Sequence, residues 1–102
     1  MTERIFSYEE AAALLPEVRR LTESACARVE TLKREPDANS AEALAVIARW
    51  GEELESRGVH AKGLWLADFD NGSGFYCWRY PEDRLEYYHT YEDGFRGRMR
   101  IH

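Results

Sequence analysis

The hydrophobic pattern of this chain changes its period once, and that change limits the fold more than any other feature. From residue 8 to residue 57, apolar side chains recur every three or four positions, which is typical of amphipathic helices. After Gly63 they alternate with a period of two, which is typical of half-buried strands. We therefore predict an α+β fold in a single domain over residues 1–102. An antiparallel helical hairpin at 8–57 would pack on an antiparallel β-meander of three to four strands at 64–101.

The start of the first helix is marked by capping chemistry. Ser7 and Glu10 have the spacing of a capping box, in which each side chain accepts a backbone N–H from the other residue. Pro16 follows nine residues after this cap, and it lacks an N–H and clashes with the preceding turn. We expect a short helix to about Leu14, a break or kink, and then a long helix from Pro16 to about Arg34.

The second helix is bounded by a turn and a glycine. Asn39 or Ser40 can cap its start, and Gly58 is placed to end it in the left-handed conformation. Gly51 would let the two helices approach closely. The inner stripe is predicted to be Leu44, Ile47, Gly51 and Leu54.

The first β-hairpin is predicted from Asn71-Gly72, because both residues tolerate positive φ. A two-residue turn there would place Leu66 opposite Cys77 and Asp68 opposite Phe75. One face of this hairpin would hold Leu64, Leu66, Asp68, Phe75, Cys77 and Arg79, and the other Trp65, Ala67, Phe69, Tyr76, Trp78 and Tyr80. The helical hairpin can cover only one of these apolar faces. We therefore predict a homo-oligomer, first of all a dimer.

Composition limits the partners and the compartment. The 102 residues carry a net charge of -5, which argues against a nucleic-acid partner. No apolar run approaches the roughly 20 residues of a membrane span, and helix-capping chemistry near the N-terminus argues against a signal peptide. The two cysteines form no disulfide framework. We expect a cytoplasmic protein with no membrane partner.

The second half of the chain resembles a family known as domain of unknown function 2203. The resemblance rests on Cys77-Trp78, Pro81-Glu82, Tyr88-His89 and Gly94-Phe95-Arg96-Gly97-Arg98, and upstream on Leu66-Ala67-Asp68-Phe69 and Leu14-Leu15-Pro16. Pro81, Tyr88 and Asp70 depart from the family's Gly, Trp and Pro. The resemblance implies a shared fold and supplies no catalytic residue.

Asp68, Cys77 and His89 are the residues whose chemistry could form a site. Carboxylate, thiolate and imidazole are all zinc ligands, and a cysteine nucleophile with a histidine base is the catalytic alternative. The ordinary interpretation is structural, with Asp68 paired to an arginine and His89 hydrogen-bonded in a cluster of rings. Whether these three side chains converge depends on a difference of one residue in the strand register. If residues 80 and 85 pair, His89 points away from Asp68 and Cys77, whereas an odd loop or a bulge brings it to their side.

A second candidate is a small anion site at Arg96 and Arg98, with Glu86 nearby. Two guanidinium groups beside glycines can hold a carboxylate or phosphate. The ordinary alternative is that these arginines pair with Asp68, Glu82 or Glu86 within the protein.

No complete catalytic motif is present, so the sequence favours a structural or interaction module over an enzyme. The alternative is a metal- or small-anion-binding protein that uses the Asp68, Cys77 and His89 cluster. We expect no cofactor unless these three residues converge, in which case zinc or another divalent metal is the candidate.

Overall fold

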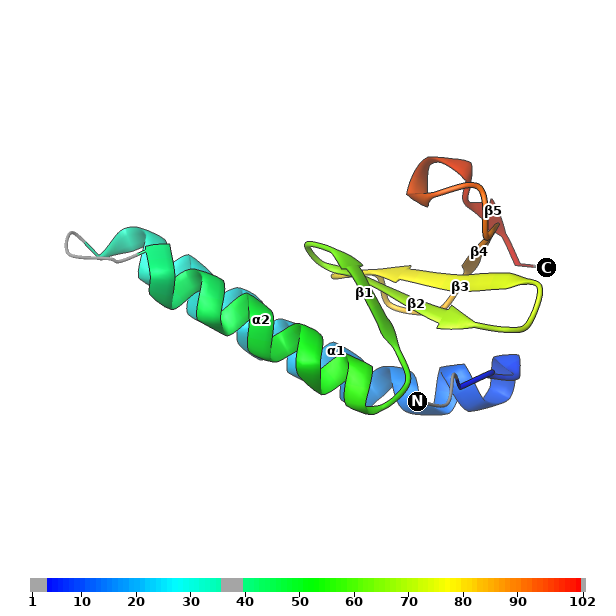
Figure 1. Ribbon diagram of the computed structural model, residues 1–102, viewed down its shortest axis with the longest axis horizontal. Coiled ribbons are helices and arrows are strands. Elements are labelled where there is room, and N and C mark those ends of the chain that lie inside the picture. The colour runs from blue at the N-terminus through cyan, green and yellow to red at the C-terminus, as the bar shows by residue number, and fades with distance from the viewer. Residues whose placement is uncertain (1–3, 36–39, 102) are drawn as a thin grey trace.

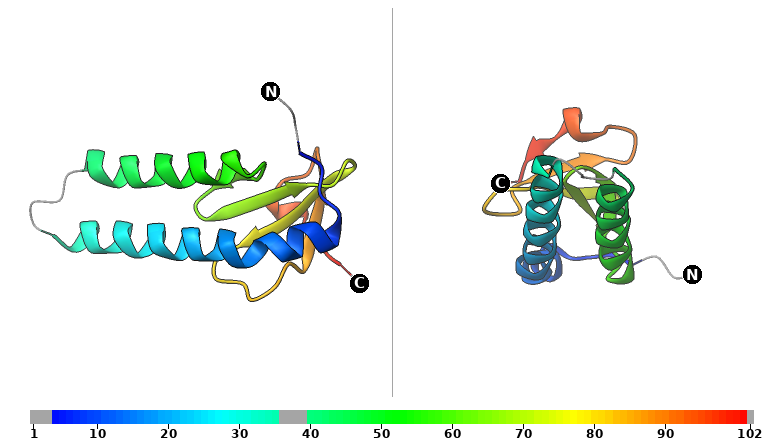
Figure 2. Two further views of the ribbon diagram at one scale, coloured as in Figure 1. Left: turned by 90° about the horizontal axis from the view of Figure 1, so that it is seen from below. Right: turned by 90° about the vertical axis from the view of Figure 1, so that its left-hand side faces the viewer.

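The computed structural model describes residues 4–35 and 40–101 of the chain. Helix α1 (Tyr8–Arg34) and helix α2 (Ser40–Ser56) lie side by side and antiparallel, as Figures 1 and 2 show. The capping box is confirmed: Ser7 N–H donates to Glu10 Oε1 at 2.8 Å, and Glu10 N–H donates to Ser7 Oγ at 3.1 Å. The predicted cap at Asn39 lies outside the described residues.

Pro16 does not break the first helix, so the prediction of a separate short helix is wrong. It lies on the exposed side of a continuous α1. Ala11 and Leu15 before it, and Val18 after it, are buried in the same core. An interior proline costs a helix about 3 kcal/mol, and burying these side chains on one continuous stripe offsets that cost.

The inner stripe of α2 also differs from the prediction. Leu44 is 64% exposed, whereas Trp50 and Leu54 are buried. Gly51 does not bring the two helices together, because a Cβ at its position would have only the Ala61 side chain nearby, 3.9 Å away. Gly58 does end the helix in the left-handed region, with φ of 80°, as predicted.

The sheet is a five-stranded antiparallel meander in the order β1-β2-β3-β4-β5, one strand more than predicted. The additional strand is β1, which follows α2 directly. At the end of the predicted meander, η1, a single 3₁₀ turn, precedes the short β5. The elements are β1 (His60–Gly63), β2 (Leu66–Asp70), β3 (Gly74–Arg79), β4 (Tyr87–Thr90), η1 (Phe95–Gly97) and β5 (Met99–Arg100).

The register between β2 and β3 is shifted by two residues from the predicted one. Asp68 pairs with Cys77, and Asp70 with Phe75. The turn is longer than two residues because Asn71 Oδ1 accepts the N–H groups of both Ser73 and Gly74, each at 2.9 Å. A shift of two residues keeps every side chain on its predicted face.

The register between β3 and β4 decides the position of His89. Phe75 pairs with His89, and Tyr76 with Tyr88. Residues paired across antiparallel strands share a face, so His89 lies on the same face as Phe75, Asp68 and Cys77. The loop between β3 and β4 therefore has the odd length that brings His89 to this face, and the predicted pairing of residues 80 and 85 is wrong.

The two faces of the sheet are covered differently. Ala67, Phe69 and Trp78 are fully buried in the core beneath the helices, where the Trp65 and Trp50 rings meet edge to face at 5.0 Å. The opposite face carries buried Asp68 and His89, and Figure 1 shows η1 and β5 on that side. That face is therefore neither wholly apolar nor uncovered. The need for a second copy of the chain to cover it is smaller than the alternation pattern implied. The homo-oligomer stays a prediction.

Among the described residues, neither helix combines the length and apolar character that would let it cross a membrane.

Candidate metal centre

Three neighbouring strands each contribute one side chain to a buried cluster. Asp68 comes from β2, Cys77 from β3 and His89 from β4, and their exposed fractions are 2%, 1% and 4%. One candidate ligand atom from each residue lies within 4.8 Å of the other two. The three residues that the sequence singled out therefore converge.

The His89 ring faces an oxygen acceptor at each nitrogen. Nδ1 lies 2.8 Å from the Thr90 carbonyl oxygen, and Nε2 lies 2.9 Å from Asp68 Oδ2. The carbonyl can only accept, so Nδ1 carries a proton. The short contact between Nε2 and Oδ2 then also needs a proton, held by one of the two groups. An Nδ1–H bonded to a backbone carbonyl is the arrangement that leaves Nε2 free to bind a metal ion.

The second oxygen of Asp68, Oδ1, is fully buried and has no hydrogen-bond partner of ordinary geometry among the described residues. The Cys77 thiol interacts with the same carboxylate as a weak donor. A buried carboxylate oxygen without a partner is costly, and such an atom calls for an explanation such as a bound ion.

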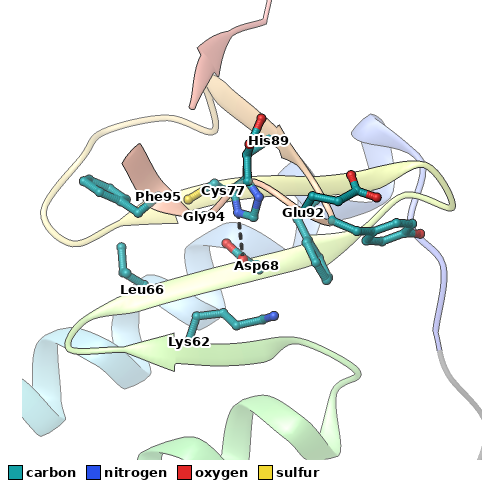
Figure 3. Close-up of a pocket in the computed structure, with 11 residues that line it drawn as sticks. Lys62, Leu66, Asp68, Cys77, His89, Glu92, Gly94 and Phe95 are labelled. Carbon is teal, nitrogen blue, oxygen red and sulfur yellow. Dashed lines mark hydrogen bonds and ion pairs between the residues drawn. The ribbon is translucent and has the colours of Figure 1, made fainter. Parts of the chain in front are cut away.

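The cluster opens into a cavity of about 290 Å³. Figure 3 shows Cys77 and His89 on one side of it, Lys62 and Leu66 on the other, and the hydrogen bond from His89 to Asp68 between them. The loop after β4 completes the wall. The lining residues are Lys62, Leu66, Asp68, Phe75, Cys77, His89, Tyr91, Glu92, Asp93, Gly94 and Phe95.

The separations fit a tetrahedral zinc site after small movements. Metal–ligand distances of about 2.0 Å for nitrogen or oxygen and about 2.3 Å for sulfur place ligand atoms about 3.3–3.5 Å apart. The contact of 2.9 Å between His89 and Asp68 would widen by a few tenths of an ångström. The largest separation in the cluster is at most 4.8 Å and would shrink by about 1 Å.

Comparison with known proteins identifies the family. A family model described as "Uncharacterized conserved protein (DUF2203)" matches residues 27–101, which is most of the chain and includes all three cluster residues. The chain belongs to the DUF2203 family. Neither the comparison with curated proteins nor the comparison with solved structures found a match. The family description assigns no activity, so function has to be inferred from the site itself.

The site of this DUF2203 protein does not have the arrangement of a cysteine nucleophile with its base. Both nitrogens of His89 face oxygen atoms rather than the Cys77 sulfur. Burial, and then the negative charge of Asp68, raise the pKa of Cys77 to about 12, although the Arg98 charge opposes this. Reactive cysteines instead have a lowered pKa and partial exposure. A metal ion would supply the positive charge that this thiolate needs.

The two arginines of the second candidate site have different surroundings. Arg98 forms a bidentate pair with Glu82, at 3.0 and 2.9 Å, and its guanidinium stacks on the rings of Tyr87 and Phe95. Its partner is thus one of the internal carboxylates that the sequence offered. Arg96 is exposed on η1. Glu86 pairs with Arg100 at 2.7 Å.

Sequence reasoning missed the residues that complete the cavity wall. Lys62 lies on β1, a strand that the sequence pattern did not predict, and Phe95 lies on η1 rather than on a strand. Phe75 was expected on the same face as Asp68, and the alternation of side chains along the strands was enough to predict that placement.

Proposed function

We propose that this DUF2203 protein binds a divalent transition metal, zinc in the first place, through Asp68, Cys77 and His89. One observation carries the proposal: three buried ligand groups of different chemical type, from three strands, converge on one point. The contact of 2.9 Å between His89 Nε2 and Asp68 Oδ2 brings two of the proposed ligand atoms to either side of the position that a metal ion would take.

The ligand set favours zinc over the hard cations. A thiolate and an imidazole suit zinc, whereas magnesium and calcium prefer oxygen ligands alone. Structural zinc sites are usually closed by four protein ligands, whereas catalytic sites keep one position open. Three protein ligands beside a cavity support the open type of site.

The test is metal stoichiometry in the untagged protein. The chain is stripped with a chelator and titrated with zinc against a competing chromophoric chelator. We expect one zinc ion per chain, and at least a hundredfold weaker binding in Cys77→Ala, because a direct ligand is lost. The matched control is Cys26→Ala, since Cys26 is the other free cysteine and lies on α1.

Asp68→Asn provides a second variant in case Cys77→Ala does not fold. Its control is Asp83→Asn, because the Asp83 side chain is 90% exposed. Zinc binding that is equal in the variants and their controls would reject the site. A protein that binds no zinc would support the interaction module instead.

The cytoplasmic location and the dimer are part of the same proposal. Both cysteines are free thiols, which fits a reducing compartment. All three metal ligands come from one chain, so a dimer is not needed to complete the site. Size-exclusion chromatography with light scattering measures the oligomeric state directly, and a monomer at all concentrations would remove the dimer from the proposal.

A further inference from the structure

Lys62, an exposed residue of β1, lines the cavity beside the cluster. No carboxylate in the described part of the chain lies within ion-pair distance of its ammonium group. The ammonium instead lies over the Phe75 ring, 4.4 Å from its centroid. The Phe75 ring also contacts the His89 ring, with centroids 5.5 Å apart. One aromatic ring therefore contacts both the lysine ammonium and the ring of a candidate metal ligand.

The charge balance at a loaded site would leave the lysine available for an anion. The two positive charges of zinc are matched by the Asp68 carboxylate and the Cys77 thiolate, while His89 binds as a neutral ring. Lys62 is then an exposed cation at the wall of a cavity whose rim also carries the exposed acids Glu92 and Asp93. A ligand with one negative charge that occupies the open metal position would pair with the Lys62 ammonium.

The remaining walls select among anions. Leu66, Phe75 and Phe95 give the cavity apolar surfaces, and its volume of about 290 Å³ is at the small end for ligand sites. Glu92 and Asp93 are exposed at the rim, where their charges disfavour a dianion such as phosphate. The cavity therefore fits a short monocarboxylic acid better than a phosphate.

We propose that Lys62 and the bound metal together hold the carboxylate of a small, largely apolar monocarboxylic acid. This inference rests on the proposed metal site and names the ligand class that the open position would accept. Lys62 binds the ligand through charge and a hydrogen bond, and the apolar walls contact its short chain.

The experiment uses the cobalt(II)-loaded protein, because the visible spectrum of cobalt(II) reports a change in its ligands. Butyrate and inorganic phosphate are titrated into the wild type, Lys62→Gln and the control Lys33→Gln. Lys33 is an exposed lysine on α1 that pairs with Glu30. We expect butyrate to change the spectrum, with about tenfold weaker binding in Lys62→Gln and no change in Lys33→Gln.

The possible results of these titrations separate a failure of the ligand inference from a failure of the metal site. Cobalt bound equally by all three proteins, with butyrate binding that is absent or is unaffected by Lys62→Gln, would overturn this inference and leave the metal site standing. A stronger response to phosphate than to butyrate would also overturn it. Failure of the wild type to bind cobalt and zinc would reject the proposed function itself.

Discussion

Among single residues, the buried pair of His89 and Asp68 has the largest energetic consequences. Their contact of 2.9 Å joins two side chains that are each at least 95% buried. Removing one partner of such a pair leaves a polar or charged group without compensation, which typically costs several kcal/mol. Removing both partners costs less, because nothing is then left unpaired.

We predict that in the metal-free protein His89→Ala lowers the free energy of unfolding by about 3 kcal/mol or more. The double variant Asp68→Ala/His89→Ala should lose less than the sum of the two single variants, by at least about 1 kcal/mol. Urea denaturation of chelator-treated protein measures all three values. Strict additivity would mean that the two side chains do not interact.

The Cys77 thiol gives a pH dependence with a defined sign. Its pKa in the folded protein is raised from 9.0 to about 12, mainly by burial. Between these two values the unfolded chain has lost the proton and the folded chain still holds it. The unfolded state then binds fewer protons, so stability falls as pH rises.

We predict that the metal-free wild type loses up to roughly 1.4 kcal/mol of stability per pH unit above pH 9 through this thiol alone. Cys77→Ala should lack this component, because it has no group to ionise. Urea midpoints at pH 8, 9 and 10 compare the two proteins, and the difference between them cancels the titration of lysines and tyrosines. Parallel pH profiles would contradict the buried, protonated thiol.

Among the secondary-structure elements, the pairing of β3 with β4 places the imidazole. Gly74 pairs with Thr90 in this ladder and is buried. A Cβ at position 74 would overlap the carbonyl oxygen of His89 and lie 3.2 Å from the Thr90 Cα. Backbone cannot move aside as a flexible side chain can, so any side chain at position 74 must separate the two strands.

We predict that Gly74→Ala lowers stability by about 2 kcal/mol and weakens zinc binding, although residue 74 touches no metal ligand side chain. Gly51→Ala is the control, because a Cβ there meets only the Ala61 Cβ, at the ordinary contact distance of 3.9 Å, and residue 51 does not line the cavity. Thermal unfolding and the zinc competition titration compare the two variants. Equal zinc affinity in both would show that the β3–β4 register does not position His89.

Local chemistry predicted those elements whose signals are contained within a few residues. The capping box at Ser7 and the left-handed Gly58 depend on neighbours in sequence, and both are present. The helical hairpin and the meander follow from the period of the apolar residues. The two faces of β2 and β3 followed from alternation, which a register shift of two residues leaves unchanged.

The predictions that failed depend on contacts between distant residues. The sequence cannot show that buried neighbours on both sides of Pro16 outweigh its helix penalty. The predicted turn between β2 and β3 was too short. The real turn is longer because the Asn71 side chain accepts hydrogen bonds from two N–H groups of the loop. Strand β1 has no alternation of its own and is defined by pairing with β2, so Lys62 was missed. The convergence of Asp68, Cys77 and His89 depended on the β3–β4 register, which the sequence left open.

In the molecule as a whole, the two faces of the sheet have different surroundings. One face forms the core with the helices, where Trp78, Leu54 and Val18 are fully buried. The other face carries polar groups of three strands beneath the segment that contains η1 (Figure 3). Burial of Asp68 and His89 is costly for a sheet that serves only as a scaffold. A metal ion would offset that cost and give this face a role.

X-ray absorption spectroscopy at the zinc edge examines the ligands of the proposed metal in the zinc-loaded protein. Binding at the cluster predicts one sulfur ligand at about 2.3 Å and nitrogen or oxygen ligands at about 2.0 Å, with the sulfur contribution lost in Cys77→Ala and retained in Cys26→Ala. A spectrum with only nitrogen and oxygen ligands in the wild type, or a sulfur contribution that survives Cys77→Ala, would contradict a zinc site at Asp68, Cys77 and His89.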